Sequence, residues 1–136
     1  MRVFVDTNVL MDFVCRREPF VEDAKRLFAM GYMGEVTLLT SALSLVNVMY
    51  VAHKYNHDEV RESLIAVAKF VEVCDLEGST VVEMLSSGWS DYEDATQNRT
   101  AMLAMADCIV TRNKKDFATS ALPVYTVPEL LAHYNV

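Results

Sequence analysis

Val3-Phe4-Val5-Asp6-Thr7-Asn8 is an apolar run that begins close to the first methionine and stops on an acid and two small polar residues. A short run of β-branched and aromatic residues is typical of a strand buried on both faces, as in parallel sheets covered by helices. In such sheets ligands bind outside the carboxyl ends of the strands, so we expect Asp6 at the mouth of a site. The alternative is a strand-end turn in which Asp6 bonds locally to Asn8.

Length and composition predict one domain over residues 1–136, with 52% hydrophobic and 23% charged residues. No apolar run approaches the roughly 20 residues that a membrane span needs. The N-terminal stretch lacks the pattern of a signal peptide, because Asp6 and Asp12 interrupt it. The 3 cysteines are too widely spaced to suggest a zinc site or a disulfide framework. We therefore expect a cytoplasmic protein with no membrane association.

The net charge of −7 argues against a generic nucleic-acid binder, which normally carries a basic surface. The argument is weaker for a protein that gathers acids in order to hold divalent cations. Such a protein has a local negative cluster, and the bound metal reverses its sign toward a phosphate. An acidic chain is thus compatible with a metal-dependent enzyme that acts on phosphate esters.

Strand-like and helix-like patterns alternate along the chain. Further apolar runs of strand length lie at residues 36–39, 71–76, 108–111 and 124–125. Amphipathic stretches separate them, which predicts an α/β fold with parallel strands. The expected helices cover residues 9–14, 19–31, 42–55, 60–68, 80–88, 91–106 and 126 onward.

Several residues have the spacing of helix caps. We expect Thr40 or Ser41 to cap the helix at 42–55, whose inward side chains should be Leu43, Val46 and Met49 or Tyr50. Helices that follow parallel strands begin at the edge of the sheet where the strands end, so the caps should lie at that edge. Three pairs have capping-box spacing, namely Thr80 with Glu83, Ser90 with Glu93 and Thr126 with Glu129.

Oxygen-bearing side chains follow the strands at this same edge. They are Asp6 after the first strand, Asn47 in the next helix, Asp91 and Asp94 at a helix start, and Thr111, Asn113 and Asp116 after the fourth strand. Hard oxygen ligands suit Mg²⁺ or Mn²⁺, which can activate water for displacement at phosphorus. The pattern therefore predicts metal-assisted phosphodiester hydrolysis.

Each of these residues also has a structural explanation. Asp91 at a helix start is favoured by the helix dipole alone, whereas Asp94 lies a turn further in, where that benefit fades. Asn47 can be a satisfied polar group on a partly exposed helix face. Lys114 and Lys115 are more often solvated charges than phosphate contacts.

Four segments together resemble a PIN domain, and the resemblance covers essentially the whole chain. They are Asp6-Thr7-Asn8, Ser41 with Asn47, Asp91-Tyr92-Glu93-Asp94-Ala95, and Thr111-Arg112-Asn113-Lys114-Lys115-Asp116-Phe117. The resemblance implies a three-layer α/β/α sandwich with a mostly parallel central sheet of about five strands. It also implies a Mg²⁺- or Mn²⁺-dependent ribonuclease. Small members resemble the toxin of VapBC-type toxin–antitoxin pairs, which implies a homodimer and a small antitoxin partner.

The resemblance assigns roles to individual residues. Asp6 matches the first acidic ligand, Asp94 matches the acid at the start of the penultimate long helix, and residues 111–116 match the last motif. Asn47 stands where the family usually has Glu, and Asn113 stands where many members have Asp, a pattern that suggests a separate branch. With these acids absent, we expect one firmly held ion on Asp6 and Asp94, assisted by Asp91 or Asp116.

The resulting hypothesis is a toxin-like endoribonuclease. Asp6 and Asp94 bind the metal, Asn47, Asp91 and Asp116 support it or orient water, and Thr111 or Asn113 hydrogen-bonds the site. The candidates for contacts with the RNA backbone are Arg16, Arg17, Arg112, Lys114 and Lys115.

Two other classes of protein compete with this hypothesis. One is a catalytically silent PIN-like module that holds RNA or a protein partner. The other is an aspartyl phosphatase of the haloacid-dehalogenase type, which needs a second acid two residues after the first, where this chain has Asn8.

Overall fold

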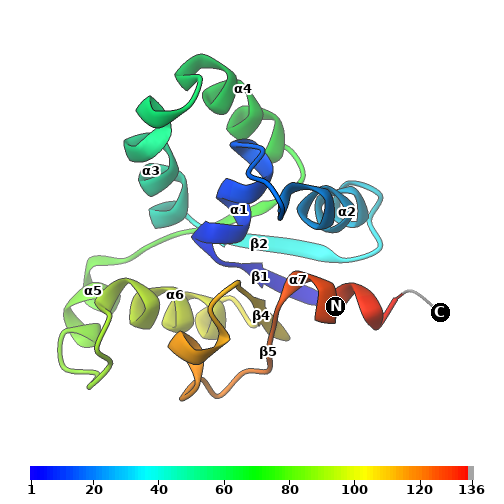
Figure 1. Cartoon of the computed structure of the whole chain (residues 1–136). Helices are drawn as coiled ribbons and strands as arrows, with labels where there is room; N and C mark the ends of the chain where they lie inside the picture. Colours follow the sequence, from blue (N-terminus) through cyan, green and yellow to red (C-terminus); the bar gives the residue numbers. More distant parts are fainter. Residues whose placement is uncertain (135–136) are drawn as a thin grey trace.

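The computed structural model describes residues 1–134 and contains a five-stranded sheet between two layers of helices (Figure 1). All four neighbouring strand pairs are parallel, and the strand order is β3-β2-β1-β4-β5. The α/β sandwich predicted from the sequence is confirmed, and its sheet is wholly parallel. The strands are β1 (Arg2–Val5), β2 (Thr37–Ser41), β3 (Glu72–Cys74), β4 (Cys108–Val110) and β5 (Val124–Tyr125).

Alternate residues of β1 pack into two separate cores, one on each face of the sheet. Val3 and Val5 face the larger core, and Phe4 faces the smaller one, as the two-residue period of a strand dictates. The larger core lies under α1 (Thr7–Val14), α2 (Val21–Tyr32), α3 (Ala42–Val51), α4 (His57–Val67) and α7 (Val127–Ala132). On the other face lie α5 (Gly78–Met84), α6 (Tyr92–Leu103) and the 3-10 turn η2 (Lys114–Phe117), while the turn η1 (Ala52–Lys54) extends α3.

Helix caps turn the chain sharply at the carboxyl edge of the sheet. Asp6 directly follows β1 and caps α1. Ser41 ends β2 and caps α3, accepting a hydrogen bond from Ser44 N at 3.0 Å. The predicted cap at Ser41 and the capping box of Thr126 with Glu129 at α7 are both confirmed. Because helix starts and strand ends coincide, several polar side chains reach one edge within a few residues.

Two of the predicted capping boxes are wrong. Helix α5 begins at Gly78 after the N-cap residue Glu77, so Thr80 lies buried inside the helix. Helix α6 is capped by Asp91, whose carboxylate accepts from Asp94 N at 3.0 Å, and Ser90 lies outside it. Aspartate offers the same acceptor as serine and adds a charge that suits the helix dipole, so the cap falls one residue later than predicted.

Helix α3 presents a face to the core that was predicted only in part, since Met49 packs against the larger core as expected but Val46 does not. Val46 and Tyr50 are 66% and 80% exposed, whereas Ser44 and Val48 are buried. Ser44 turns inward because its hydroxyl joins a buried hydrogen-bond network with Thr7 and Gln97. That polar anchor, rather than the apolar spacing, sets the rotation of the helix.

Helix α2 does not end at Gly31, as the sequence suggested, but continues to Tyr32. A Cβ atom at position 31 would lie 2.7 Å from Leu38 Cγ, so the glycine lets the helix approach β2 closely. The chain turns away from the helix end at Gly34, whose φ is +78°; Gly34 N donates to Gly31 O at 3.2 Å and Glu35 N donates to Met30 O at 2.9 Å. These bonds form a Schellman motif.

The helices of the described residues 1–134 are too short or too polar to cross a membrane.

Candidate functional site

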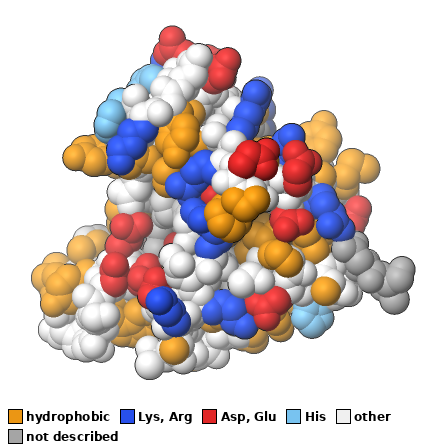
Figure 2. Space-filling view, viewed as in Figure 1, with side chains coloured by type: hydrophobic (Ala, Val, Ile, Leu, Met, Phe, Trp, Pro, Cys, Tyr) orange, Lys and Arg blue, Asp and Glu red, His pale blue; other side chains and the backbone are white. Residues whose placement is uncertain are grey.

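A cleft of about 480 Å³ opens at the carboxyl edge of the sheet, between α1 and the second half of α3 on one side and the start of α6 and the segment after β4 on the other. The molecular surface is indented between the part that carries α3 and α4 and the part that carries α5 and α6, and acidic side chains gather there (Figure 2). The cleft brings together six of the residues predicted from the sequence, which are Asp6, Asn47, Asp91, Asp94, Asn113 and Asp116.

Thr111, the remaining predicted residue, is fully buried behind the cleft. Its hydroxyl donates to Asp6 Oδ2 at 2.8 Å, and Thr7 N donates to Asp6 Oδ1 at 2.8 Å. The Thr111 oxygen in turn accepts from Asn8 Nδ2 at 3.3 Å and from Asn113 N at 3.1 Å. Asp6 is thus held in one orientation by groups from two segments, the start of α1 and the residues that follow β4.

The acids of the cleft disfavour one another's ionisation. Burial raises the pKa of Asp6 to about 6, with smaller contributions from Glu93 and Asp116, although the hydrogen bonds from Thr111 and Thr7 lower it. Burial and, after it, four neighbouring acids together raise the pKa of Asp94 to about 7, the acids contributing in the order Asp91, Asp6, Asp116 and Glu93. Asp94 is the more exposed of the two, but no hydrogen bond offsets its shift. A proton or a cation would relieve the crowding.

These shifts predict two aspartates that titrate well above the usual range in metal-free protein. In the unfolded chain both carboxyls ionise near pH 4, whereas the folded protein holds their protons until about pH 6 and 7. The folded state therefore binds more protons between those values, and its stability falls as pH rises through this window. Carbon NMR titration of the carboxyl groups in EDTA measures the midpoints. Midpoints below 5 for every aspartate would contradict the prediction.

A buried ion-pair cluster that the sequence analysis missed forms another wall of the cleft. Asp12 is 2% exposed and lies 2.9 Å from Arg17 Nε and 3.0 Å from Arg112 Nε. The Arg17 contact is also a hydrogen bond, while the Arg112 contact is an ion pair without hydrogen-bond alignment. Burial raises the pKa of Asp12 more than the two arginines lower it. The cluster fixes two guanidinium groups beside the acids.

A second network that the sequence analysis missed joins the starts of three helices beneath the cleft. Gln97 is fully buried, and its Nε2 donates to Thr7 Oγ1 at 3.0 Å and to Ser44 Oγ at 2.7 Å. The two hydroxyls also bond to each other at 2.7 Å. A usable signal existed, because Gln97 lies three residues after Asp94 on one helix face, and Thr7 directly follows Asp6.

The predicted RNA-contacting cations divide into two groups. Arg17 and Arg112 line the cleft, as expected. Lys114 instead pairs with Glu129 at 3.0 Å. Arg16 lies in a small hollow beside Tyr55, and Lys115 lies in a different hollow beside Trp89. The cleft therefore gathers two of these five cations.

Fold and cleft together define a parallel α/β protein with an acidic, partly buried site at the carboxyl edge of its sheet. The chain belongs to the PIN domain family, whose model matches residues 2–115. No curated protein matches the sequence.

Solved structures with the same fold come from several bacteria. VapBC2 from Rickettsia felis, bound to a DNA fragment from its promoter, aligns with a TM-score of 0.67 and 17% identity over 91% of this chain and 97% of that one. A toxin–antitoxin complex from Klebsiella pneumoniae aligns with a TM-score of 0.65 and 24% identity over 92% of this chain and 97% of that one. Mycobacterium tuberculosis VapC20, a toxin that cleaves the sarcin-ricin loop, aligns with a TM-score of 0.68 and 15% identity over 88% of this chain and 95% of that one. At these identities the similarity establishes the fold.

Proposed function

We propose that this protein is a Mg²⁺- or Mn²⁺-dependent endoribonuclease that hydrolyses RNA phosphodiester bonds, acting as the toxin of a toxin–antitoxin pair. The observation that carries the proposal is the crowding of Asp6 and Asp94 with three further acids in one cleft, at a cost visible in their raised pKa values. Strongly shifted carboxyls in a cleft are typical of functional sites.

The donor set suits a hydrated ion rather than a closed cage. Within residues 1–134, no group of three or more His, Cys, Asp or Glu side chains is arranged to hold a metal ion. Mg²⁺ needs only one or two carboxylates, keeps several waters and takes further oxygens from substrate phosphate. Asp6 and Asp94 would supply the two carboxylates, with Asp91 or Asp116 assisting, and a cation would replace the protons that they otherwise hold.

The chain's own groups would prepare the reaction around that ion. A bound divalent ion lowers the pKa of water and stabilises charge that develops at phosphorus. Thr111 and Thr7 N fix the two oxygens of Asp6. Arg17 and Arg112, held by Asp12, would attract the substrate phosphate to the cleft. The side-chain amides of Asn47 and Asn113, which line the cleft, would hydrogen-bond water or substrate.

The toxin role and its partners extend the same proposal. Proteins of this fold include toxins solved with antitoxins, which supports a small antitoxin partner here. A toxin that cuts cellular RNA would act in the cytoplasm. Exposed apolar side chains on α3 and α5, among them Val46, Tyr50, Val82 and Leu85, support a homodimer, because such surface is commonly covered by a second protein.

Cleavage of a structured RNA pool by purified protein in Mg²⁺, Mn²⁺ or EDTA tests the proposal. We expect internal cuts with either metal, none in EDTA, and recovery when excess Mg²⁺ is added back. An Asp94→Asn variant purified in parallel controls for contaminating nucleases.

Protein that is inert in every metal would contradict the nuclease proposal and favour the catalytically silent binding module. The variant Asn47→Glu then locates the cause, because it restores an acid to the cleft wall. Activity gained by Asn47→Glu would show that the amide at this position explains the lack of cleavage, since an amide neutralises no cation charge.

A further inference from the structure

A second hollow, of about 340 Å³, lies directly beside the acid cleft. The start of α2, the loop after β4 and the start of α7 enclose it. Its wall includes Phe20, Asp23, Val127 and Pro128, together with Arg112 and Asn113, which also line the acid cleft. The two hollows are therefore neighbours that share Arg112 and Asn113 as part of their walls. We call this second space the base hollow.

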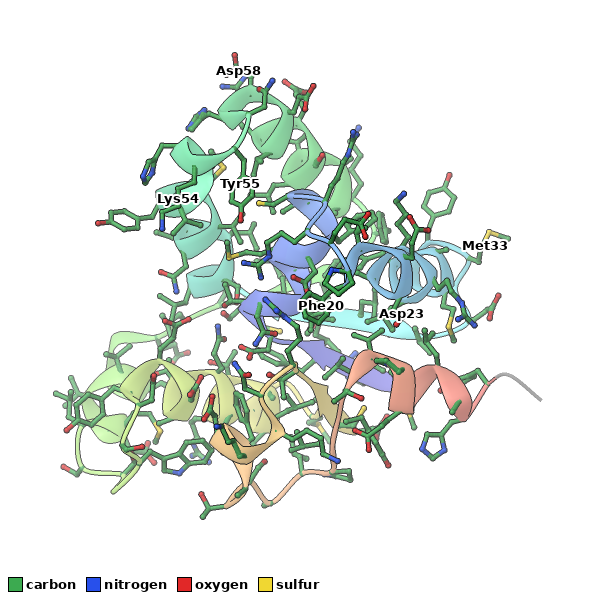
Figure 3. The ribbon with its side chains drawn as sticks, in the orientation of Figure 1. Phe20, Asp23, Met33, Lys54, Tyr55 and Asp58 are labelled. Carbon is green, nitrogen blue, oxygen red and sulfur yellow. The ribbon has the colours of Figure 1, made fainter. Side chains whose placement is uncertain are left out.

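Phe20 and Arg112 form a cation–π pair in the wall of the base hollow. The guanidinium carbon of Arg112 lies 4.0 Å from the centroid of the Phe20 ring, and Asp12 anchors that guanidinium from behind. Phe20 is 40% exposed although it is a large apolar residue. Its side chain lies at the start of α2 next to Asp23, above α7 (Figure 3). Aromatic rings and arginine planes are the surfaces on which proteins stack unpaired bases.

We propose that the base hollow binds a nucleobase of the RNA, next to the phosphate that occupies the acid cleft. This inference rests on the proposed nuclease function and assigns its substrate a second contact. The volume is within the range of small-molecule pockets, and Val127 and Pro128 supply apolar contacts for a planar ring. Arg112 lines both the acid cleft and the base hollow. Its guanidinium can therefore contact a phosphate in the cleft while Phe20 stacks on the base.

Asp23 gives the base hollow a basis for selecting among bases. Its carboxylate lies 3.8 Å from Arg26 Nη1, beyond hydrogen-bonding distance, and lines the hollow. An ionised carboxylate only accepts hydrogen bonds, so it favours bases whose edges donate. Guanine presents two neighbouring N–H groups on its pairing edge and is the best match.

Binding of single-stranded hexaribonucleotides to the Asp94→Asn variant tests the proposal with cleavage switched off. Fluorescence anisotropy in Mg²⁺ is measured for a hexamer and for six versions that each carry one abasic unit. We expect one abasic position to weaken binding about tenfold, the effect of losing one base–aromatic stack. Adding Phe20→Ala should weaken binding of the intact hexamer by the same factor. The six abasic versions should then bind this protein with the same affinity as the intact hexamer.

Three further variants sharpen the test. Phe20→Tyr keeps a ring and should keep the dependence on that position. Tyr32→Ala removes another exposed aromatic residue at the opposite end of α2 and should change nothing. Asp23→Asn should reduce a preference for guanine at the sensitive position without changing the other positions. Thermal melts confirm that each variant is folded.

The outcomes separate this proposal from the nuclease proposal. If no single base matters, or if Phe20→Ala weakens every version equally, the base hollow does not bind a base. Metal-dependent cleavage by the wild type would then leave the nuclease proposal intact. If the wild type does not cleave and the variant binds no RNA, both proposals fall together.

Discussion

Asp94→Asn should abolish RNA cleavage and at the same time stabilise the metal-free protein at pH 8. At that pH Asp94 is ionised among four other acids of the cleft, and the amide removes this repulsion. We expect a gain of about 1 kcal/mol in the free energy of unfolding, since partial solvent exposure screens the repulsion. The same carboxylate would hold the metal. Losing the metal's stabilisation of the transition state, about 4 kcal/mol, would lower the cleavage rate of the variant about 10³-fold.

The gain in stability must depend on pH and on metal. At pH 4 the folded wild type already carries a proton on Asp94, so the variant should be no more stable there. Mg²⁺ should raise the melting temperature of the wild type and leave that of the variant almost unchanged. Urea unfolding in EDTA at pH 4 and 8, together with thermal melts in Mg²⁺, measures these differences.

Asp58→Asn is the matched control for Asp94→Asn. Asp58 also lies in the first turn of a helix, but its side chain is 79% exposed and distant from the cleft, at the end of the molecule that carries α4 (Figure 3). This variant should keep full activity and change stability by less than about 0.5 kcal/mol. A destabilised or fully active Asp94→Asn protein would contradict the assignment of Asp94.

The sequence predicted the parts of the site that local patterns determine. Asp6 follows a short apolar run, Asp94 lies in the first turn of a helix, and residues 111–116 follow another buried run. In a parallel sheet, the strands end and the helices that follow them begin at the same edge. The meeting of these residues in the cleft therefore follows from topology alone. This is why residues far apart in the chain could be grouped before their distances were known.

The parts that it missed depend on contacts between distant residues, for which local patterns give at most a partial signal. Asp12 meets Arg112, and Gln97 meets Ser44, across separations that periodicity does not encode. The inward face of α3 was predicted only in part for the same reason, because the buried partners of Ser44 are on other helices. Polar contacts between elements outweighed apolar spacing at each of these places.

Thr111→Val should destabilise the protein and raise the pKa of Asp6 further. Valine has nearly the shape of threonine but cannot donate to Asp6 Oδ2, the contact that most strongly lowers the pKa of this carboxyl. A buried acceptor left without its donor costs about 1–3 kcal/mol, so we expect a loss of about 2 kcal/mol in the free energy of unfolding. The NMR midpoint of Asp6 should move above its wild-type value of about 6. Cleavage should fall about 10–100-fold, as is typical when a group that orients a metal ligand is lost.

Thr40→Val separates these effects from the general cost of burying valine in place of threonine. Thr40 is 1% exposed on strand β2, which pairs with β1, and its hydroxyl donates to Val5 O at 3.3 Å rather than to an acid. Thr40→Val should cost about 1 kcal/mol and leave the Asp6 midpoint unchanged. Thr111→Ser keeps the hydroxyl and should restore both the midpoint and most of the activity. If Thr111→Val lowers stability without moving that midpoint, the Thr111 hydroxyl stabilises the fold through Asn8 and Asn113 N rather than through Asp6, and the orientation of Asp6 must come from Thr7 N alone.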